Sequence, residues 1–514
     1  MPRSSLPPRL LALTTLLLAS AAYGCSSAQD LAANAVSNAS RTTAPSAPSP
    51  PPAPRAAPAP APAPDGGEAP PAPPLPEGEV AKTYVDFAIN HVLSTGQSNS
   101  VANGATPVLT TTQPYTNVSF NTGVMPMSNC DGDGCYQFDA PSSFVPLVEG
   151  DNFFGYGVET ASAGIANEIS HLAAARYHFG TKAGLPSKHD VLVSLHGRSG
   201  NTYWCLRKNS CNYHAAGMVK PFSQAMLEVQ AAKQIADAAG LSYAVRAVTT
   251  IHGESDHYAY TDHRQEFPLD GTDGTPAKIK DYADALVEWQ HDYETDAKAI
   301  TGQALGIPLL VAQLSGWNDA RTSRVAQWQL EAHLRAPGKV VLVSPGYAFS
   351  VREDCLHYDN HGQRRLGEYF AKAYARIVFS GQAWEPLRPT SVTRSGNAIS
   401  AKFLVPKPPL VLDTTQVTNP GNYGFDVVDD AGTLLTVASV ALAGADTVTI
   451  TLAAPPAGAL HLRYAQNQPV GACIGPGTSY SGGARGNVRD SDDSPSQYGY
   501  DLSNWSVAFD VPVK

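Results

Sequence analysis

Two short polar segments contain the residue types of a nucleophilic active site. Ser98 stands in "TGQSN", directly after the apolar run "HVL", and Asp354 precedes His357 by three residues in "DCLH". A serine hydroxyl attacks a carbonyl when a base removes its proton, and a histidine oriented by a carboxylate supplies that base. The spacing lets the Asp354 carboxylate reach Nδ1 of His357 while Nε2 faces outward. The two segments therefore indicate a Ser-His-Asp site.

Each segment alone has a plainer interpretation. A serine in a turn commonly hydrogen-bonds its own backbone, and an Asp–His pair is often an exposed pair or a helix cap. Two further segments favour chemistry: "VLVSL" runs into "HGRSGNTYW", and "AVRAVTTI" runs into "HGESDH". Backbone N–H groups in such a glycine-containing turn can face an oxyanion. Four polar segments in this order, each after an apolar run, predict one hydrolytic site.

Alternating strands and helices are expected to position these segments. Apolar runs typical of buried strands lie at 91–95, 191–195, 244–251, 309–314 and 340–344. Helical patterns lie between and after them, at 164–180, 223–240, 277–302 and 362–379. This alternation predicts an α/β domain over residues 81–384, with a mostly parallel five-stranded sheet and flanking helices. Such sheets gather their ligand sites at the carboxyl ends of the strands.

The remaining residues, 385–514, predict an all-β, sandwich-like domain. Helical periodicity is lost there, and alternating runs such as "AISAKFLV", "TVTITL" and "ALHLRY" are separated by turn residues. Tyr464, Tyr480 and Trp505 could line a sugar-binding face, although packing in the core is the commoner fate of aromatic residues in a small β-domain.

The order of the four segments carries a resemblance to a known family. "TGQSN", "GRSGNTYWCL", "HGESD" and "DCLHYDNHGQRRLGEYFAKAY" resemble successive blocks of the SGNH hydrolase superfamily, and most closely the sialate O-acetylesterase-like carbohydrate esterases. The resemblance covers residues 85 to 380 and implies a flavodoxin-like fold. It also implies a serine esterase that removes O-acetyl groups from a polysaccharide or a sialic-acid-like sugar, without a metal or organic cofactor.

The resemblance assigns roles to the catalytic residues. It makes Ser98 the nucleophile, His357 the general base and then acid, and Asp354 the residue that orients His357. The N–H of Ser98 would form the oxyanion hole with that of Gly200, or with that of Gly197 as the fallback.

The third block departs from the family pattern at one residue. The family usually has Gln before Gly-Glu-Ser, whereas this chain has His252. If His252 contributes to the oxyanion hole or hydrogen-bonds its neighbours, its imidazole would make the strength of the hole depend on pH near neutrality. Gln97, Asn99 and Gly253 are predicted supporting residues. Glu254 is interpreted as an acceptor that braces the loops, with substrate binding as the alternative.

The first 80 residues indicate export and a spacer. Residues 1–24 contain Arg3, Arg9 and the apolar run "LLALTTLLLASAA", which predicts a signal peptide. "AYGC" resembles a lipobox in which Cys25 becomes lipidated; plain cleavage near Ala21 is the alternative. Residues 25–80 are rich in Ala and Pro and predict a disordered linker. These features predict a bacterial cell-envelope lipoprotein, or a secreted protein.

Charge limits the expected partners. The formal net charge of −10 argues against nucleic acid and anionic membranes as electrostatic partners. Membrane contact is therefore expected only through the N-terminal lipid, and an acetylated carbohydrate is the expected substrate.

The cysteine count fits an oxidising compartment. Seven cysteines become six once Cys25 is lipidated. The predicted pairs are Cys130–Cys135, Cys205–Cys211 and Cys355–Cys473, although six cysteines allow 15 connectivities. The stretch "CDGDGC" has too few oxygen ligands for a calcium loop. A Cys355–Cys473 bond would join the β-domain to the loop that carries the base.

Two other functions remain open at this point. One is an esterase or lipase for acyl esters of non-carbohydrate compounds, which would have a wider apolar acyl pocket. The other is a non-catalytic glycan-binding surface lipoprotein that keeps the fold. A binding protein has no need of Ser98, Asp354 and His357 together, which favours the enzyme.

Overall fold

The computed structural model describes residues 78–129, 136–150, 157–209, 218–261, 266–315, 323–466 and 483–514. The predicted signal peptide, Cys25 and the linker up to residue 77 lie outside these residues, as do Tyr480 and four cysteines, Cys130, Cys135, Cys211 and Cys473. The described residues belong to one compact unit. Within the described ranges, no helix is both long enough and apolar enough to cross a membrane.

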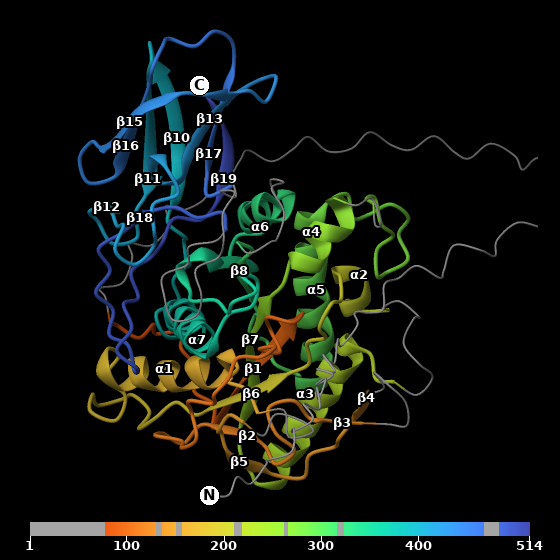
Figure 1. The fold of residues 1–514 in the computed structure, drawn as a ribbon. Helices are drawn as coiled ribbons and strands as arrows, with labels where there is room; N and C mark the ends of the chain where they lie inside the picture. Colours follow the sequence, from red (N-terminus) through yellow and green to blue (C-terminus); the bar gives the residue numbers. More distant parts are fainter. Residues whose placement is uncertain are drawn as a thin grey trace, which may run out of the picture. The chain divides into compact units, whose positions relative to one another are not determined.

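A seven-stranded, mostly parallel sheet forms the core of the first part of this unit (Figure 1). The spatial order is β5 (Phe144–Pro146), β2 (Val118–Phe120), β6 (Val191–Leu195), β1 (Ile89–Gly96), β7 (Tyr243–Ile251), β8 (Leu309–Gln313) and β9 (Val340–Pro345). The five strands predicted from apolar runs are confirmed as β1, β6, β7, β8 and β9, and neighbours among them pair in parallel. The sheet has two strands more than the five predicted. The sequence did not indicate β2 and β5, because each is only three residues long.

The strand order fixes where the sheet can hold a ligand. Numbered along the chain, the five long parallel strands run 2-1-3-4-5 across the sheet, which is the flavodoxin-like order. The direction of this strand order reverses between the adjacent strands β1 and β7. The loops that leave these two strands therefore run to opposite faces of the sheet. Ligands bind in that crevice, beyond the carboxyl ends of the strands. Ser98 follows β1, and His252 and Glu254 follow β7.

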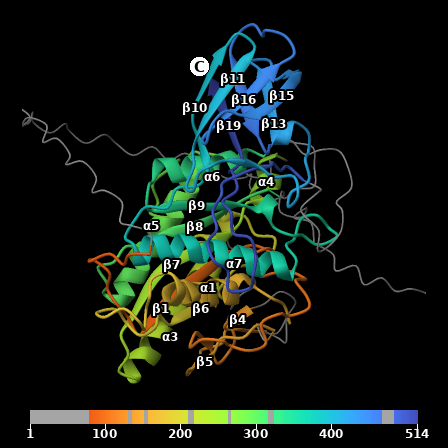
Figure 2. The same cartoon turned by 90° about the vertical axis from the view of Figure 1, so that its left-hand side faces the viewer.

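Helices cover both faces of the sheet. α1 (Ala161–Ala175) and α7 (Asn360–Tyr374) lie side by side over one face (Figure 2), and α3 (Pro221–Ala238), α5 (Tyr282–Thr301) and α6 (Arg324–Arg335) cover the other. The remaining helical elements are short: α2 (Tyr203–Leu206), α4 (Glu254–Thr261), η1 (Gly346–Ala348), η3 (Asn422–Gly424) and the π-turn η2 (Ala375–Phe379) that continues α7. The strands β3 (Met127–Asn129) and β4 (Tyr136–Phe138) pair apart from the main sheet.

Side-chain caps place the helix ends. The Asp281 side chain accepts the N–H of Asp284 at the start of α5, and Gly302 ends that helix in the left-handed conformation at φ +71°. Asp359 caps α7 in the same way by accepting the Gly362 N–H. Because α7 starts at Asn360, the loop between β9 and α7 must present Asp354 and His357 just before the cap.

Two glycines allow α1 and α7 to pack closely. A Cβ atom on Gly164 would lie 2.3 Å from the Arg364 carbonyl oxygen, and one on Gly367 would lie 2.5 Å from the Ala161 carbonyl oxygen. Neither backbone can move away without separating the helices. This approach brings Glu168, one turn after Gly164, next to Glu368.

Antiparallel strands follow α7, as the sequence predicts. One sheet has the order β10 (Arg388–Ser395), β11 (Ala398–Leu404), β16 (Thr447–Leu452), β15 (Val437–Leu442), and the other has the order β14 (Leu434–Leu435), β13 (Phe425–Asp429), β17 (Leu460–Tyr464), β19 (Phe509–Val513). Buried and less buried residues alternate along β16. Phe403 and Phe509, from different sheets, are buried with their ring centroids 6.1 Å apart. Tyr464 and Trp505 are also buried, so core packing and not a sugar-binding face is their role.

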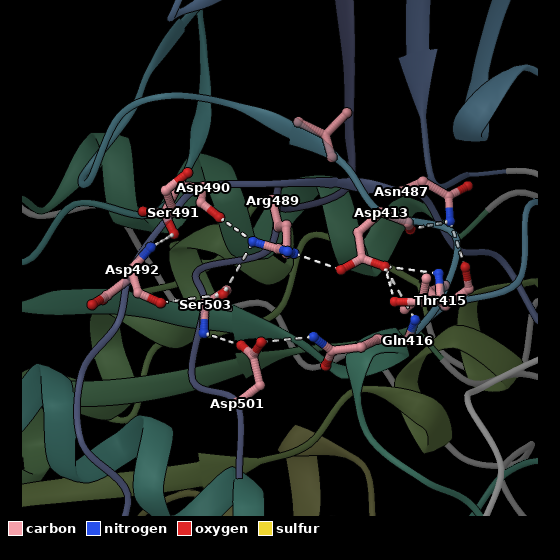
Figure 3. Close-up of polar contacts among 12 residues, drawn as sticks. Asp413, Thr415, Gln416, Asn487, Arg489, Asp490, Ser491, Asp492, Asp501 and Ser503 are labelled. Atoms are coloured by element: carbon pink, nitrogen blue, oxygen red, sulfur yellow. Dashed lines mark hydrogen bonds and ion pairs between the residues drawn. The ribbon is translucent and has the colours of Figure 1, made fainter.

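A polar network joins the short β12–β18 pair to the C-terminal segment (Figure 3). β12 (Val411–Leu412) pairs with β18 (Val488–Arg489). Arg489 Nε donates to Asp413 Oδ2 at 2.7 Å, and Gln416 Nε2 donates to Asp501 Oδ2 at 2.9 Å. Burial raises the pKa of Asp413, but its hydrogen bonds from Arg489 and Thr415 outweigh this and lower the pKa to about 2. The network holds the C-terminal segment in place where it approaches α7.

The C-terminal segment is anchored on α7 by charged groups. The Lys372 ammonium contacts Asp492 Oδ2 at 2.8 Å and Asn504 Oδ1 at 2.9 Å, and also donates to the Leu502 carbonyl. Lys372 is buried, so a partner for its charge is required. The β-strands after residue 385 are thus tied to a helix of the α/β part.

Candidate active site

Ser98 lies in a tight turn at the carboxyl end of β1. Gly96 ends the strand at φ +133°, and a Cβ atom there would lie 2.1 Å from the Ile251 carbonyl oxygen of β7. The Gln97 carbonyl then accepts hydrogen bonds from the Ser100 N–H at 2.9 Å and the Ser100 hydroxyl at 2.7 Å. Ser98 is 7% exposed, at the crevice predicted by the strand order.

Asp354 and His357 form a hydrogen-bonded pair in the loop before α7. His357 Nδ1 and Asp354 Oδ2 are 2.8 Å apart, and Asp354 Oδ1 accepts the N–H groups of Leu356 at 3.0 Å and His357 at 2.9 Å. Burial raises the pKa of Asp354, but these hydrogen bonds outweigh burial and hold the pKa well below its usual range. An ionised Asp354 keeps the proton on Nδ1 and leaves Nε2 as the basic nitrogen.

Asn99 joins the serine turn to the histidine loop. Its Nδ2 donates to the Leu356 carbonyl at 3.1 Å, and its Oδ1 accepts the Tyr358 N–H at 3.0 Å. The residues on both sides of His357 are therefore bonded to the neighbour of Ser98. Within the described residues, no hydrogen bond joins the Ser98 hydroxyl to His357. Such bonds are often long in a substrate-free site and shorten when the reacting group is bound.

Glu254 is placed as the predicted loop brace. It is buried, and its Oε1 accepts from Asn99 Nδ2 at 2.6 Å. Burial raises its pKa, an effect that the Asn99 hydrogen bond and the neighbouring His357 imidazole oppose. Gln97 supports the same junction, since its Oε1 accepts the Ser255 N–H at 2.8 Å. Gly253 fits tightly at φ +146°, where a Cβ atom would lie 2.9 Å from Val325 Cγ1.

The two candidate oxyanion glycines have different surroundings. Gly197 is buried, and a Cβ atom on it would lie 2.2 Å from Ser100 Oγ, so it allows the two turns to pack. Gly200 is exposed at φ +72°, with no atom within 4 Å of its Cβ position. Among the described residues, the N–H groups of Ser98, Gly197 and Gly200 have no backbone acceptor. Hydrogen bonding therefore does not choose between the two glycines, and Gly200 is kept as the preferred oxyanion donor because it is the exposed one.

Of the two possibilities for His252, hydrogen bonding to its neighbours is the one observed, and the ring does not reach an oxyanion directly. His252 is buried, and its Nε2 lies 3.1 Å from the Asn201 carbonyl oxygen while its Nδ1 pairs with the Tyr282 hydroxyl. Both ring nitrogens are occupied, so neither can donate to an oxyanion. Burial lowers the pKa of His252 to about 4, despite the opposing Asn201 hydrogen bond. Its charge therefore does not change near neutrality, contrary to the expectation from sequence.

Arg352 is a contact of the site that the sequence reasoning missed. Its Nη1 donates to the Asn103 carbonyl at 3.1 Å and lies 3.4 Å from Asp354 Oδ2. The Asn103 N–H in turn donates to the Ser98 carbonyl at 3.0 Å. Arg352 thus connects the Asp354 loop to the serine turn. Its position two residues before Asp354 was the only signal in the sequence.

Two of the described cysteines, Cys205 and Cys355, form disulfide bonds. Their predicted partners, Cys211 and Cys473, lie outside the described residues, so the pairings stay predictions. The Cys130–Cys135 pair lies wholly outside them.

Comparisons with known proteins add a distant likeness. No family model matches the chain, and no curated protein matches it. Among solved structures, a carbohydrate acetylesterase from Xanthomonas citri is similar at 14% identity and a TM-score of 0.40, covering 79% of this chain and 81% of that one. A protein from Arabidopsis thaliana is similar at 15% identity and a TM-score of 0.31, covering 55% of this chain and 97% of that one. The α/β fold therefore rests on the strand order described above.

Proposed function

We propose that the protein is a serine esterase that removes O-acetyl groups from a carbohydrate through an acyl-enzyme. The observation that carries the proposal is the Asp354–His357 hydrogen bond, in a loop that Asn99 ties to the turn bearing Ser98. An isolated Asp–His pair has many explanations. A pair braced against a serine at the ligand-binding edge of a parallel sheet has the arrangement that nucleophilic catalysis needs.

The proposed reaction has two stages. His357 removes the Ser98 proton as the hydroxyl oxygen attacks the ester carbonyl, and the N–H groups of Ser98 and Gly200 stabilise the oxyanion. His357 then gives the proton to the departing alcohol, which leaves Ser98 acetylated. Water, deprotonated by His357, then attacks the acetyl carbonyl. The bond to Ser98 breaks as His357 returns the proton to the serine oxygen, and acetate is released. Asp354 keeps the imidazole oriented and stabilises its charged form throughout.

The choice of an acetylated carbohydrate rests on the four sequence blocks and on their resemblance to the sialate O-acetylesterase-like carbohydrate esterases. A serine esterase for non-carbohydrate acyl esters would use the same catalytic residues. For the location we propose export, with lipidation at Cys25 and the 25–80 linker holding the enzyme away from the membrane. Export is supported by the N-terminal sequence and by the disulfide-bonded Cys205 and Cys355.

The experiment that tests this function compares parent and Ser98→Ala on the p-nitrophenyl esters of acetate, butyrate and octanoate at about pH 8. Acetate is expected to be hydrolysed fastest, and the substitution is expected to lower kcat by three or more orders of magnitude, roughly. Preference for octanoate would favour the lipid-type esterase. No turnover by the parent, together with binding of acetylated glycans, would favour the non-catalytic glycan-binding protein.

A further inference from the structure

We propose that His252 is a positioning residue of the oxyanion hole, acting through the turn that carries the Gly200 N–H group. This inference rests on the proposed esterase function and deepens it. It assigns a role to the one residue at which the chain departs from the pattern of the family it resembles.

The first support is the hydrogen bonding of the His252 ring. A carbonyl oxygen only accepts, so the 3.1 Å contact with the Asn201 carbonyl places the proton on Nε2. Nδ1 then accepts from the Tyr282 hydroxyl. The Tyr282 ring lies nearly parallel to the imidazole, with an interplanar angle of 23°, and the Trp289 ring packs edge-on, with its centroid 5.5 Å away. The imidazole is thus held in one neutral tautomer, aimed at Asn201.

The second support is a parallel tether on the same turn. Asp256 Oδ2 accepts the Tyr203 N–H at 3.0 Å and lies 3.2 Å from His252 Nε2, and Asp256 Oδ1 accepts from the Tyr260 hydroxyl at 3.0 Å. His252 follows β7 directly, Asp256 lies in the first turn of α4, and both are buried. The segment after β7 therefore holds the turn at both Asn201 and Tyr203.

The third support is that Gly200 has little packing of its own. It is exposed, has no side chain, and no atom lies within 4 Å of its Cβ position. The direction of its N–H therefore depends on the residues that follow it. A buried donor on the Asn201 carbonyl fixes the peptide group between Asn201 and Thr202, the second after Gly200, and a small displacement of an oxyanion donor costs much of its stabilisation.

The chemistry explains why histidine can stand where the family has glutamine. A neutral imidazole offers one N–H donor and one nitrogen acceptor, and a glutamine amide offers an N–H donor and an oxygen acceptor. Either can donate to the Asn201 carbonyl and accept from the Tyr282 hydroxyl. His252→Gln keeps this pair of bonds, whereas His252→Leu removes both at similar volume.

Protonation of His252 would remove its acceptor for Tyr282. The titratable groups in contact with the ring are Asp256 of α4 and Tyr282 of α5, both buried, and Glu254 and Tyr203 are buried on the neighbouring α4 and α2. Burial lowers the pKa of His252 to about 4 and raises that of Asp256 to about 7. The neutral imidazole therefore persists over the range in which a serine esterase works.

The test measures kcat and KM for p-nitrophenyl acetate in the parent, His252→Gln and His252→Leu. We expect His252→Leu to lower kcat by roughly 10- to 100-fold with KM nearly unchanged, because only the transition state carries the oxyanion. His252→Gln should stay within about threefold of the parent. Parent-like kcat in His252→Leu would overturn the proposal, and equal losses in both variants would overturn the donor–acceptor explanation.

A matched control separates positioning from general destabilisation. His189 is equally buried, and it lies just before β6, whereas the turn with Gly200 follows that strand. Its ring contacts the hydroxyls of Tyr84 at 3.0 Å and Tyr374 at 2.8 Å. His189→Leu should lower thermal stability about as much as His252→Leu while keeping the parent kcat at 25 °C. A comparable loss of kcat in His189→Leu would attribute the effect to stability and overturn the proposal.

Hydrogen exchange gives a readout that does not need turnover. Amides of residues 200–203 should exchange faster in His252→Leu than in the parent, and His252→Gln should resemble the parent. If the parent hydrolyses none of the esters, the esterase function fails, but exchange still decides whether His252 orders this turn. Unchanged exchange in His252→Leu contradicts the positioning role in either case.

Discussion

Two sets of carboxyl groups near α7 differ in the charge that their surroundings impose. Asp354, in the loop before the helix, has a side chain 39% exposed and accepts from an imidazole and two backbone N–H groups. Glu368 of α7 and Glu168 of α1 are fully buried and interact with each other. Burial raises the pKa of both, that of Glu368 to about 7, although Ser496 donates to it. Donors keep Asp354 charged, whereas burial beside a second acid favours protonation.

The difference assigns the two sets to different tasks. A charged Asp354 stabilises a histidine base. The buried pair instead holds the C-terminal segment, because Glu168 Oε2 accepts the Gln497 N–H at 2.7 Å and Glu368 Oε2 accepts from the Ser496 hydroxyl at 2.7 Å. The same residue type therefore supports chemistry in one place and docking in the other, and substitutions should separate the two.

The largest expected effect comes from neutralising the exposed carboxylate. Asp354→Asn should lower kcat for p-nitrophenyl acetate by about 10⁴-fold, because the amide cannot stabilise the imidazolium and favours the wrong tautomer. The control is Asp501→Asn, a change of the same shape at a hydrogen-bonded aspartate of the C-terminal segment. A parent-like rate in Asp354→Asn would remove Asp354 from the catalytic group.

The next effect comes from cutting the link between the serine turn and the histidine loop. Asn99→Ala removes the bonds to Leu356, Tyr358 and Glu254. We expect kcat to fall by roughly 100-fold, since a displacement of about 1 Å at a catalytic group has that cost. Steady-state kinetics measures this, with circular dichroism to check that the fold is kept. A change in KM alone would indicate that Asn99 serves substrate binding.

A smaller, pH-dependent effect is expected at the buried pair. The raised pKa values mean that the folded protein binds more protons than the unfolded chain above about pH 4.5, so the free energy of unfolding falls as pH rises toward 7. Glu368→Gln removes one of the two groups that bind this extra proton in the folded state. The free energy of unfolding of the variant, relative to that of the parent, should therefore rise by roughly 1–2 kcal/mol between pH 5 and pH 8.

Urea unfolding at the two pH values measures this gain, and Glu331→Gln on the exposed face of α6 is the control. Equal pH dependence in parent and Glu368→Gln would contradict the raised pKa of Glu368. Because Glu368 takes no part in the proposed chemistry, kcat of the variant should stay near that of the parent.

The smallest effect is expected from Ser496→Ala. The loss of its hydrogen bonds to Glu368 should cost about 1 kcal/mol, and more at pH 8 than at pH 5, because a carboxylate loses more than a protonated acid when its donor is removed. The same urea series measures it. A loss of unfolding free energy that is larger at pH 5 than at pH 8 would contradict the protonation of Glu368 at the lower pH.

The fold was largely predictable, because the five long strands and their helices are continuous apolar or periodic runs. The strands β2 and β5 were not, since three residues carry no period. The contact between Glu168 and Glu368 was also hidden. It depends on the close approach of α1 and α7 at Gly164 and Gly367, which only the packed structure reveals.

The candidate site was predictable in its residues and less so in its electrostatics. Ser98, Asp354 and His357 stand out because they follow predicted strands. The state of His252 could not be deduced, because its pKa depends on burial and on partners far away in the chain, such as Tyr282. For the same reason, the sequence did not reveal that Lys372 holds the C-terminal segment on α7.

The most direct test of the account is to trap the acyl-enzyme. The parent is mixed with p-nitrophenyl acetate, quenched in acid within the first turnovers, and digested for peptide mass mapping. The account predicts one acetyl group on Ser98, absent in Ser98→Ala. Turnover with the acetyl group on another residue, or equal turnover by Ser98→Ala, would contradict it.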